Sequence, residues 1–133
     1  FTDPQKYVWA IQWYYSEVEN GGHDQFFYND TGIVWELALE GLRVIDCSTF
    51  ASILEEAVQR IGGYPSKDRE ARWHEMSMHN ADFSDLDMKF YDREHELEQY
   101  LRDYVRCNRE YLIFDGIVHF PEDYAPDEYE FDE

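Results

Sequence analysis

The most constraining feature of the sequence is a run of apolar residues that recur at the spacing of one α-helical face. From residue 49 to residue 61 they stand three or four positions apart without a gap, and Gly62-Gly63 follows directly. Such spacing lets a helix bury one face, and glycine ends helices because it tolerates backbone angles that other residues avoid. We therefore expect a helix over 49–61 with Leu54 and Ala57 buried. The apolar face consists of Phe50, Ile53, Leu54, Ala57, Val58 and Ile61.

The same spacing predicts helices in the first third of the chain. Asp3 followed by Pro4 is typical of a helix start, with Asp3 as the cap. This helix should end at Asn20-Gly21-Gly22, before a short element at 23–29, and the next should cover about 32–45. The face of the first is Tyr7, Val8, Ile11, Tyr14, Tyr15 and Val18, and that of the next is Ile33, Val34, Leu37, Ala38, Gly41, Val44 and Ile45.

Three more helices are predicted after residue 63. Ser66 should cap a weaker helix to about 78, Ser84 should cap another, and a long helix should end near 108. Asp115-Gly116 lies between two short apolar runs, which is a β-hairpin signal, although frayed helix and coil fit the same residues. The expected fold is therefore all-α: a single compact multi-helix domain over 1–120 with a short C-terminal hairpin as an option, then an acidic tail over 121–133. The face of the long helix is Leu97, Tyr100, Leu101, Tyr104 and Val105.

The net charge of the chain limits the kinds of partner that it can bind. The chain has 30 acidic and 11 basic residues, a net charge of −19, and residues 110–133 contain nine acidic residues and no basic one. Hydrophobic residues at 44% and aromatic residues at 18% can still fill a core, so disorder throughout is excluded. An acidic protein repels phosphates, which argues against direct binding to nucleic acid or to an anionic membrane. A basic partner fits instead.

The density of this charge is similar to that of DNA. A compact domain of this length is about 36 Å across, and duplex DNA of that length carries about 21 phosphate charges. The chain's −19 is of the same order. The count permits a protein that resembles DNA electrostatically.

Residues that could carry chemistry do not form a complete pattern. His74 and His79 are five positions apart, about 140° around a helix, whereas zinc proteases need two histidines four apart on one face. Asp82, Asp85 and Asp87 resemble part of a calcium loop but lack its glycine and its final glutamate. We therefore expect no metal, no cofactor and no enzymatic activity.

Cysteine usage and hydropathy bear on the compartment. Cys47 and Cys107 cannot build a disulfide framework, and free buried thiols are the usual state of such residues. No apolar run approaches the roughly 20 residues that a membrane span needs. A cytoplasmic protein is the expectation.

Two segments resemble a known family. The string Gly21-Gly22-His23-Asp24-Gln25-Phe26-Phe27-Tyr28-Asn29, followed by Thr31-Gly32, is similar to the signature of a small bacterial family of acidic DNA-mimic proteins. Asp82–Asp87 and Phe90-Tyr91 resemble a second motif of that family, and the likeness covers about 5–110. In structural terms, the glycines should end one helix, Phe26 and Phe27 should anchor the next, and the amides of Gln25 and Asn29 should bond backbone at the turns.

The resemblance implies a largely helical homodimer that binds a helix-turn-helix transcription factor and prevents its binding to DNA. Trp9, Trp13 and Trp35 lie near helix faces with apolar residues on both sides, which agrees with a dimer. An immunity-type inhibitor that covers the basic cleft of a nuclease toxin is the alternative. An enzyme with an acidic pocket is a third hypothesis, which the missing ligand spacing disfavours. The candidate partner-binding carboxylates are Glu17, Glu19, Asp24, Asp30, Glu36, Glu40, Asp82, Asp85, Asp87, Asp92, Glu94, Glu96 and Glu98.

Overall fold

Helices account for all the regular secondary structure of residues 2–108, the part of the chain that the computed structural model describes. The predicted all-α fold is confirmed over this range. The proposed hairpin and the tail over 121–133 lie outside the described residues. In chain order the elements are α1 (Asp3–Tyr28), the 3-10 helix η1 (Asp30–Val34), α2 (Trp35–Val44), α3 (Ser48–Gln59), α4 (Arg69–Met78), α5 (Ser84–Asp92) and α6 (Glu94–Cys107).

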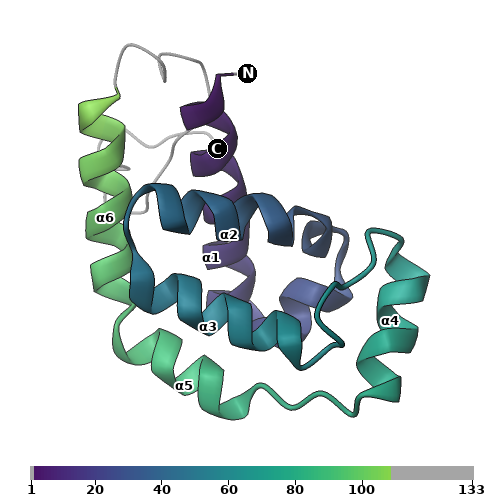
Figure 1. The fold of residues 1–133 in the computed structure, drawn as a ribbon. Coiled ribbons are helices and arrows are strands. Elements are labelled where there is room, and N and C mark those ends of the chain that lie inside the picture. The colour runs from purple at the N-terminus through teal and green to yellow at the C-terminus, as the bar shows by residue number, and fades with distance from the viewer. Residues whose placement is uncertain (1, 109–133) are drawn as a thin grey trace, which may run out of the picture.

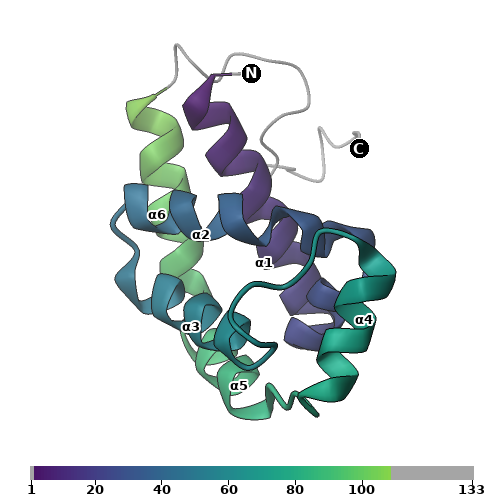
Figure 2. The same ribbon diagram turned by 45° about the vertical axis from the view of Figure 1, so that its right-hand side comes forward.

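The helices are arranged around α1. In Figures 1 and 2, α2 crosses α1, α3 runs back below α2, and α6 lies beside the first half of α1. The helix α4 stands apart from α6, beside the last turns of α1. As a result, the end of the described chain returns close to its start, and the second half of α1 lies between α4 and α5.

The core is rich in aromatic rings. Phe90, with no exposed surface, contacts Tyr14 and Phe50 edge to face, with ring centroids 5.6 and 5.2 Å apart. Leu54 and Ala57 are fully buried, as predicted. Edge-to-face contacts favour one arrangement of rings over others, so this cluster fixes how α1, α3 and α5 pack.

Three residues of the predicted apolar faces are exposed instead. Ile33, Val44 and Tyr100 are 48%, 50% and 42% accessible. Ile33 lies in η1, whose three residues per turn shift the register before α2 begins, and α2 buries a face that contains Trp35 and Leu39. The faces of the other helices are closer to prediction because they contain no such change of period.

The helix starts differ from the predicted caps. Thr2, and not Asp3, caps α1 through a reciprocal pair of hydrogen bonds with Gln5. Asp68 caps α4, whereas Ser66 donates its hydroxyl to Glu75. Ser84 does not cap α5 either, because it is the first residue of that helix and follows Phe83. Several short polar residues lie near the starts of α1 and α4, and the residue that becomes the cap depends on where the first turn packs. In the described residues, no helix is both long and apolar enough to cross a membrane.

Replacing Leu54 with alanine is expected to lower the free energy of unfolding by about 3 kcal/mol, because it leaves a cavity in a closely packed core. Urea denaturation measures this change. The control is Val44→Ala, at a half-exposed position, which should change stability by less than about 0.5 kcal/mol. Equal stabilities of the Leu54→Ala variant and the wild type would show that this helix register is wrong.

Candidate partner-binding surface

The glycine pair breaks α1 at the position that the sequence predicts. Gly22 has a φ of 77°, in the left-handed region that glycine adopts without strain, and a Cβ there would lie 2.5 Å from Oδ2 of Asp87. The break redirects the chain so that Phe26 and Phe27 are fully buried, as expected. It also lets α5 approach the backbone of α1 closely.

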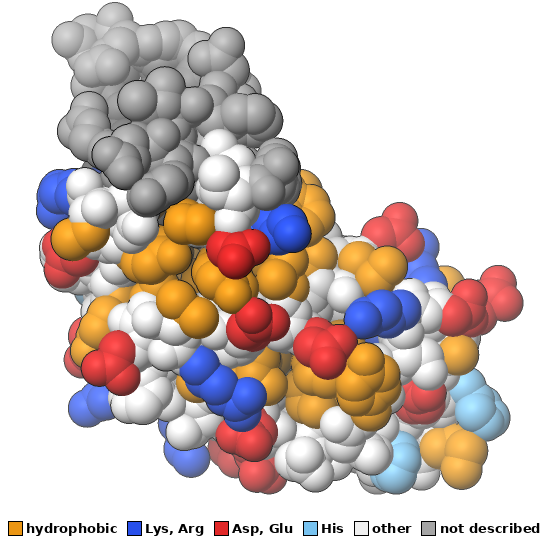
Figure 3. All heavy atoms as spheres, turned by 45° about the horizontal axis from the view of Figure 1, so that its top comes forward, with side chains coloured by type: hydrophobic (Ala, Val, Ile, Leu, Met, Phe, Trp, Pro, Cys, Tyr) orange, Lys and Arg blue, Asp and Glu red, His pale blue; other side chains and the backbone are white. Residues whose placement is uncertain are grey.

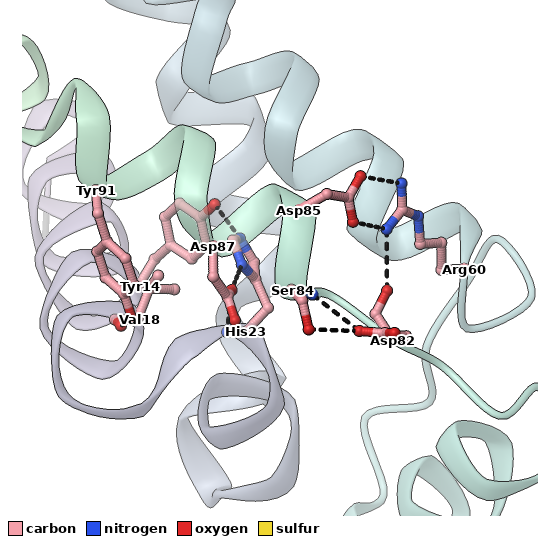
Figure 4. Close-up of polar contacts among 9 residues, drawn as sticks. All are labelled: Tyr14, Val18, His23, Arg60, Asp82, Ser84, Asp85, Asp87 and Tyr91. Carbon is pink, nitrogen blue, oxygen red and sulfur yellow. Dashed lines mark hydrogen bonds and ion pairs between the residues drawn. The ribbon is translucent and has the colours of Figure 1, made fainter.

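His23 and Asp87 join the two sequence segments of the resemblance. The buried imidazole places Nδ1 2.6 Å from Oδ1 of Asp87, and the His23 backbone N–H donates to the same oxygen at 2.9 Å. On its other side, Nε2 lies 2.7 Å from the hydroxyl of Tyr14, as Figure 4 shows. Sequence reasoning did not identify His23, although its place inside the glycine-rich string was a usable signal.

Glu17 holds the two halves of the broken helix together. Its Oε1 accepts hydrogen bonds from the side-chain amides of Gln25, at 3.0 Å, and Asn29, at 2.9 Å. The prediction that these amides bond backbone is therefore wrong. Since Glu17 lies before the break and the amides lie after it, its carboxylate acts as an internal brace.

Arg72 of α4 is the largest fully buried side chain. It donates to the backbone carbonyls of Phe27 and Asn29, each at 2.6 Å, and of Ser66 and Lys67, at 2.9 and 3.3 Å. Burial, followed by the nearby Arg69, lowers its pKa. The sequence offered no signal for this role, because Arg72 stands in an otherwise polar helix. Its guanidinium ties α4 and the loop before it to the end of α1.

Six of the predicted carboxylates lie near one another in the fold, and we call this group the acidic seam. It follows the junction of α1 with α5 and the first turns of α6, and its neighbours along the seam influence one another electrostatically. Two seam carboxylates pair with histidines, Asp87 with His23 at 2.6 Å and Glu98 with His95 at 3.5 Å. The seam consists of Glu19, Asp24, Asp82, Asp87, Glu94 and Glu98.

Burial raises pKa values in the seam, and neighbouring carboxylates add to this effect. Partial loss of hydration, together with a hydrogen bond to Glu94, raises the pKa of Glu19 to about 7. Dehydration and then the charges of Asp87 and Asp82 raise the pKa of Asp24. A cation placed on this surface would relieve the repulsion, so the seam favours basic ligands.

Internal bonds are found both in the seam, where Asp87 accepts from His23, Glu98 from Tyr15 and Asp82 from Ser84, and at most of the other predicted carboxylates. Asp85 forms a two-point contact with Arg60 at 2.6 and 3.0 Å, which lowers the pKa of Asp85 to about 2 (Figure 4). On the face in Figure 3, carboxylates stand as separate groups among basic and hydrophobic side chains. The remaining contacts are Glu36 with Lys67 at 3.0 Å, Glu40 with the Tyr7 hydroxyl at 2.6 Å, Asp30 with Arg69 at 3.6 Å and Glu96 with Arg93 at 3.8 Å.

Asp92 lies apart from the seam. It lines an open groove of about 570 Å³ between α3 and α5, together with Lys89, Arg93 and the apolar side chains of Ile53 and Leu86. The cations of this groove reduce the contribution of Asp92 to any acidic surface.

Metal and thiol chemistry finds little support in residues 2–108. No group of three or more His, Cys, Asp or Glu side chains in this range could hold a metal ion. His74 and His79 are both exposed on α4 and its C-terminal end. Cys47 is buried, and burial raises its pKa to about 11, whereas Cys107 is exposed, contrary to the expectation of two buried thiols.

Replacing Glu19 with glutamine should stabilise the protein at pH 8 and change little at pH 5. The folded pKa, about 7, lies above the ordinary value of 4.5, so the wild type loses stability as pH rises between these values. Glutamine at this position cannot ionise. Thermal unfolding at both pH values measures the difference, with Glu55→Gln as the exposed control. A difference that is the same at pH 5 and pH 8 would contradict the assignment.

The chain belongs to the DMP19-like protein family, whose model matches residues 1–108. This family takes its name from a DNA-mimic protein. Searches of curated proteins and of solved structures found no match. The matched range coincides closely with the described helical part, so the family relation extends over the whole acidic seam.

Proposed function

We propose that the protein is a DNA mimic that binds the DNA-binding surface of a bacterial helix-turn-helix transcription factor and blocks its access to DNA. Two findings support this: membership of the DMP19-like family, and the gathering of six carboxylates in the acidic seam. The seam is the observation that carries the proposal, because it brings together carboxylates from α1, from α6, and from α5 and the residues just before it. Such a concentration of negative charge attracts the lysine and arginine residues of a DNA-binding surface.

The electrostatics of the seam suit reversible competition with DNA. A face that binds DNA carries several lysine and arginine residues, which contact phosphates one by one. Carboxylates at similar density can occupy the same cations, and each such contact is weakened by salt. The same charge opposes direct binding of the protein to nucleic acid or to an anionic membrane.

A competition experiment tests the proposal. The partner is captured from a lysate of the native cell at low salt, identified by mass spectrometry, and purified. Its affinity for its DNA is then measured with increasing amounts of the protein at two salt concentrations. We expect mutual exclusion of DNA and protein, with both affinities falling as salt rises. Simultaneous binding without loss of either affinity would contradict mimicry, and capture of a nuclease would favour the immunity-type alternative.

We also propose that the functional unit is a homodimer in the cytoplasm. Trp13 and Tyr100 are 41% and 42% accessible in the single chain, so each leaves apolar surface that a second copy could cover. Sedimentation equilibrium at micromolar concentration should give twice the mass of one chain. A monomer mass under these conditions would contradict the dimer and would leave the competition experiment unaffected.

A further inference from the structure

Two hollows lie side by side where α4 stands against the last turns of α1. They have volumes of about 290 and 410 Å³. Asp24, Tyr28 and Met76 line both of them. Since Asp24 belongs to the acidic seam, the hollows adjoin the seam on the side of α4, whose residues Trp73, Met76 and Ser77 line the smaller one.

The wall between the hollows is a flat aromatic surface. The Tyr28 ring is 50% exposed and stacks on Trp73 with a centroid distance of 4.7 Å and an angle of 17° between the planes. The indole N–H donates to the Tyr28 carbonyl at 2.7 Å, which fixes the stack. A rigid, half-exposed ring offers its face to a planar cation at little cost in conformational entropy.

The protein already places one guanidinium on this aromatic pair. The Cζ atom of Arg69 lies 4.7 Å from the Trp73 ring centroid and 5.5 Å from that of Tyr28. Its Nε donates to the Tyr28 carbonyl at 2.9 Å. Arg69 does not line either hollow, so the hollows remain open beside it.

Acceptors for a second guanidinium surround the ring. Asp24 is exposed, and no ion pair among the described residues includes it. Ser77 and Asn80 line the smaller hollow, and the described hydrogen bonds leave both side chains available. The charges of Asp82 and Asp87 reinforce the negative potential at Asp24.

We infer that the hollows beside Tyr28 bind an arginine side chain of the basic partner, stacked on the Tyr28 ring and paired with the Asp24 carboxylate. Arginine fits better than lysine, because its planar guanidinium can stack and donate two parallel hydrogen bonds at once. This inference rests on the proposed function, since it takes the partner to be a basic protein. It adds a specific anchor to a surface that otherwise acts through charge.

Peptide binding to the full chain tests the inference without the natural partner. Octaarginine and octalysine carry equal charge, and their affinities are compared by fluorescence anisotropy in about 0.15 M salt, where weak surface attraction is screened. We expect octaarginine to bind about fivefold or more tightly than octalysine. Tyr28→Ala and Asp24→Asn should each remove this preference, whereas Tyr28→Phe, which keeps the ring, should retain it. Tyr64→Ala and Glu55→Gln, at exposed positions elsewhere, are the matched controls.

The outcomes distinguish a specific arginine site from non-specific attraction of cations to a negatively charged protein. Equal affinities of the two peptides for the wild type, or a preference that survives both Tyr28→Ala and Asp24→Asn, would overturn the inference. Melting temperatures near the wild-type value would show that the variants are folded. A captured partner that competes with DNA but tolerates Tyr28→Ala would overturn the arginine site alone, whereas simultaneous binding of partner and DNA would overturn the proposed function.

Discussion

Replacing Arg72 with alanine should destabilise the protein by at least about 4 kcal/mol, because four backbone carbonyls would lose a charged donor. These carbonyls belong to Phe27, Asn29, Ser66 and Lys67, so the loss would detach α4 from the end of α1. Gly32 packs closely on the guanidinium: a Cβ added at this position would lie 2.7 Å from Nε of Arg72. Chemical denaturation followed by circular dichroism measures the effect.

Two further variants show whether the stability depends on the several N–H donors of the Arg72 guanidinium or only on its positive charge. Arg72→Lys keeps the charge but cannot serve four carbonyls, so it should remain strongly destabilised. Arg43→Ala removes an exposed arginine that pairs with Glu55 at 3.2 Å, and it should cost less than about 1 kcal/mol. If Arg72→Ala and Arg43→Ala had similar stabilities, the structural role of the buried guanidinium would be refuted.

Reversing two seam charges, Glu19→Lys with Glu94→Lys, should weaken binding to the captured partner on the order of 100-fold. Each reversal adds a repulsion, and together they remove the negative charge that this neighbouring pair of carboxylates carries. The dependence of affinity on salt should also become flatter, because fewer ion pairs form. Competition with DNA at two salt concentrations measures both effects.

The charge-matched control is Glu36→Lys with Glu40→Lys. These carboxylates were also predicted to bind the partner, but Glu36 is paired with Lys67 and Glu40 accepts from the Tyr7 hydroxyl. We expect this pair of reversals to weaken binding by about tenfold or less. Equal losses from the two double variants would mean that net charge alone determines affinity, and the seam would have no special role.

Local periodicity was sufficient to predict the helices, because burying one face of a helix leaves a pattern in neighbouring residues. The break at Gly21-Gly22 and the burial of Leu54 follow from such local rules. The exposure of Ile33 does not, since it depends on a short 3-10 turn whose packing is decided by distant residues.

The candidate site was less predictable than the helices, because it depends on contacts between residues that are distant in the sequence. Glu19 and Glu94 are far apart in the sequence, and only the packing of α6 on α1 makes them neighbours. Glu17 seemed equivalent to Glu19, yet its carboxylate is bonded to Gln25 and Asn29. The tertiary structure determines which carboxylates have internal partners. A list of acidic residues therefore could not distinguish Glu17, which bonds within the protein, from the carboxylates of the seam.

The contact between Gly22, His23 and Asp87 has a consequence for how this family diverges. Asp87 fills the space beside Gly22 and accepts both His23 N–H groups, so a change at one of these positions would leave the others clashing or without a partner. Across related sequences, these three positions should be inherited together or replaced together. Exposed seam positions such as Asp24 and Glu19 carry no such constraint from the fold and are free to change with the partner that each relative binds.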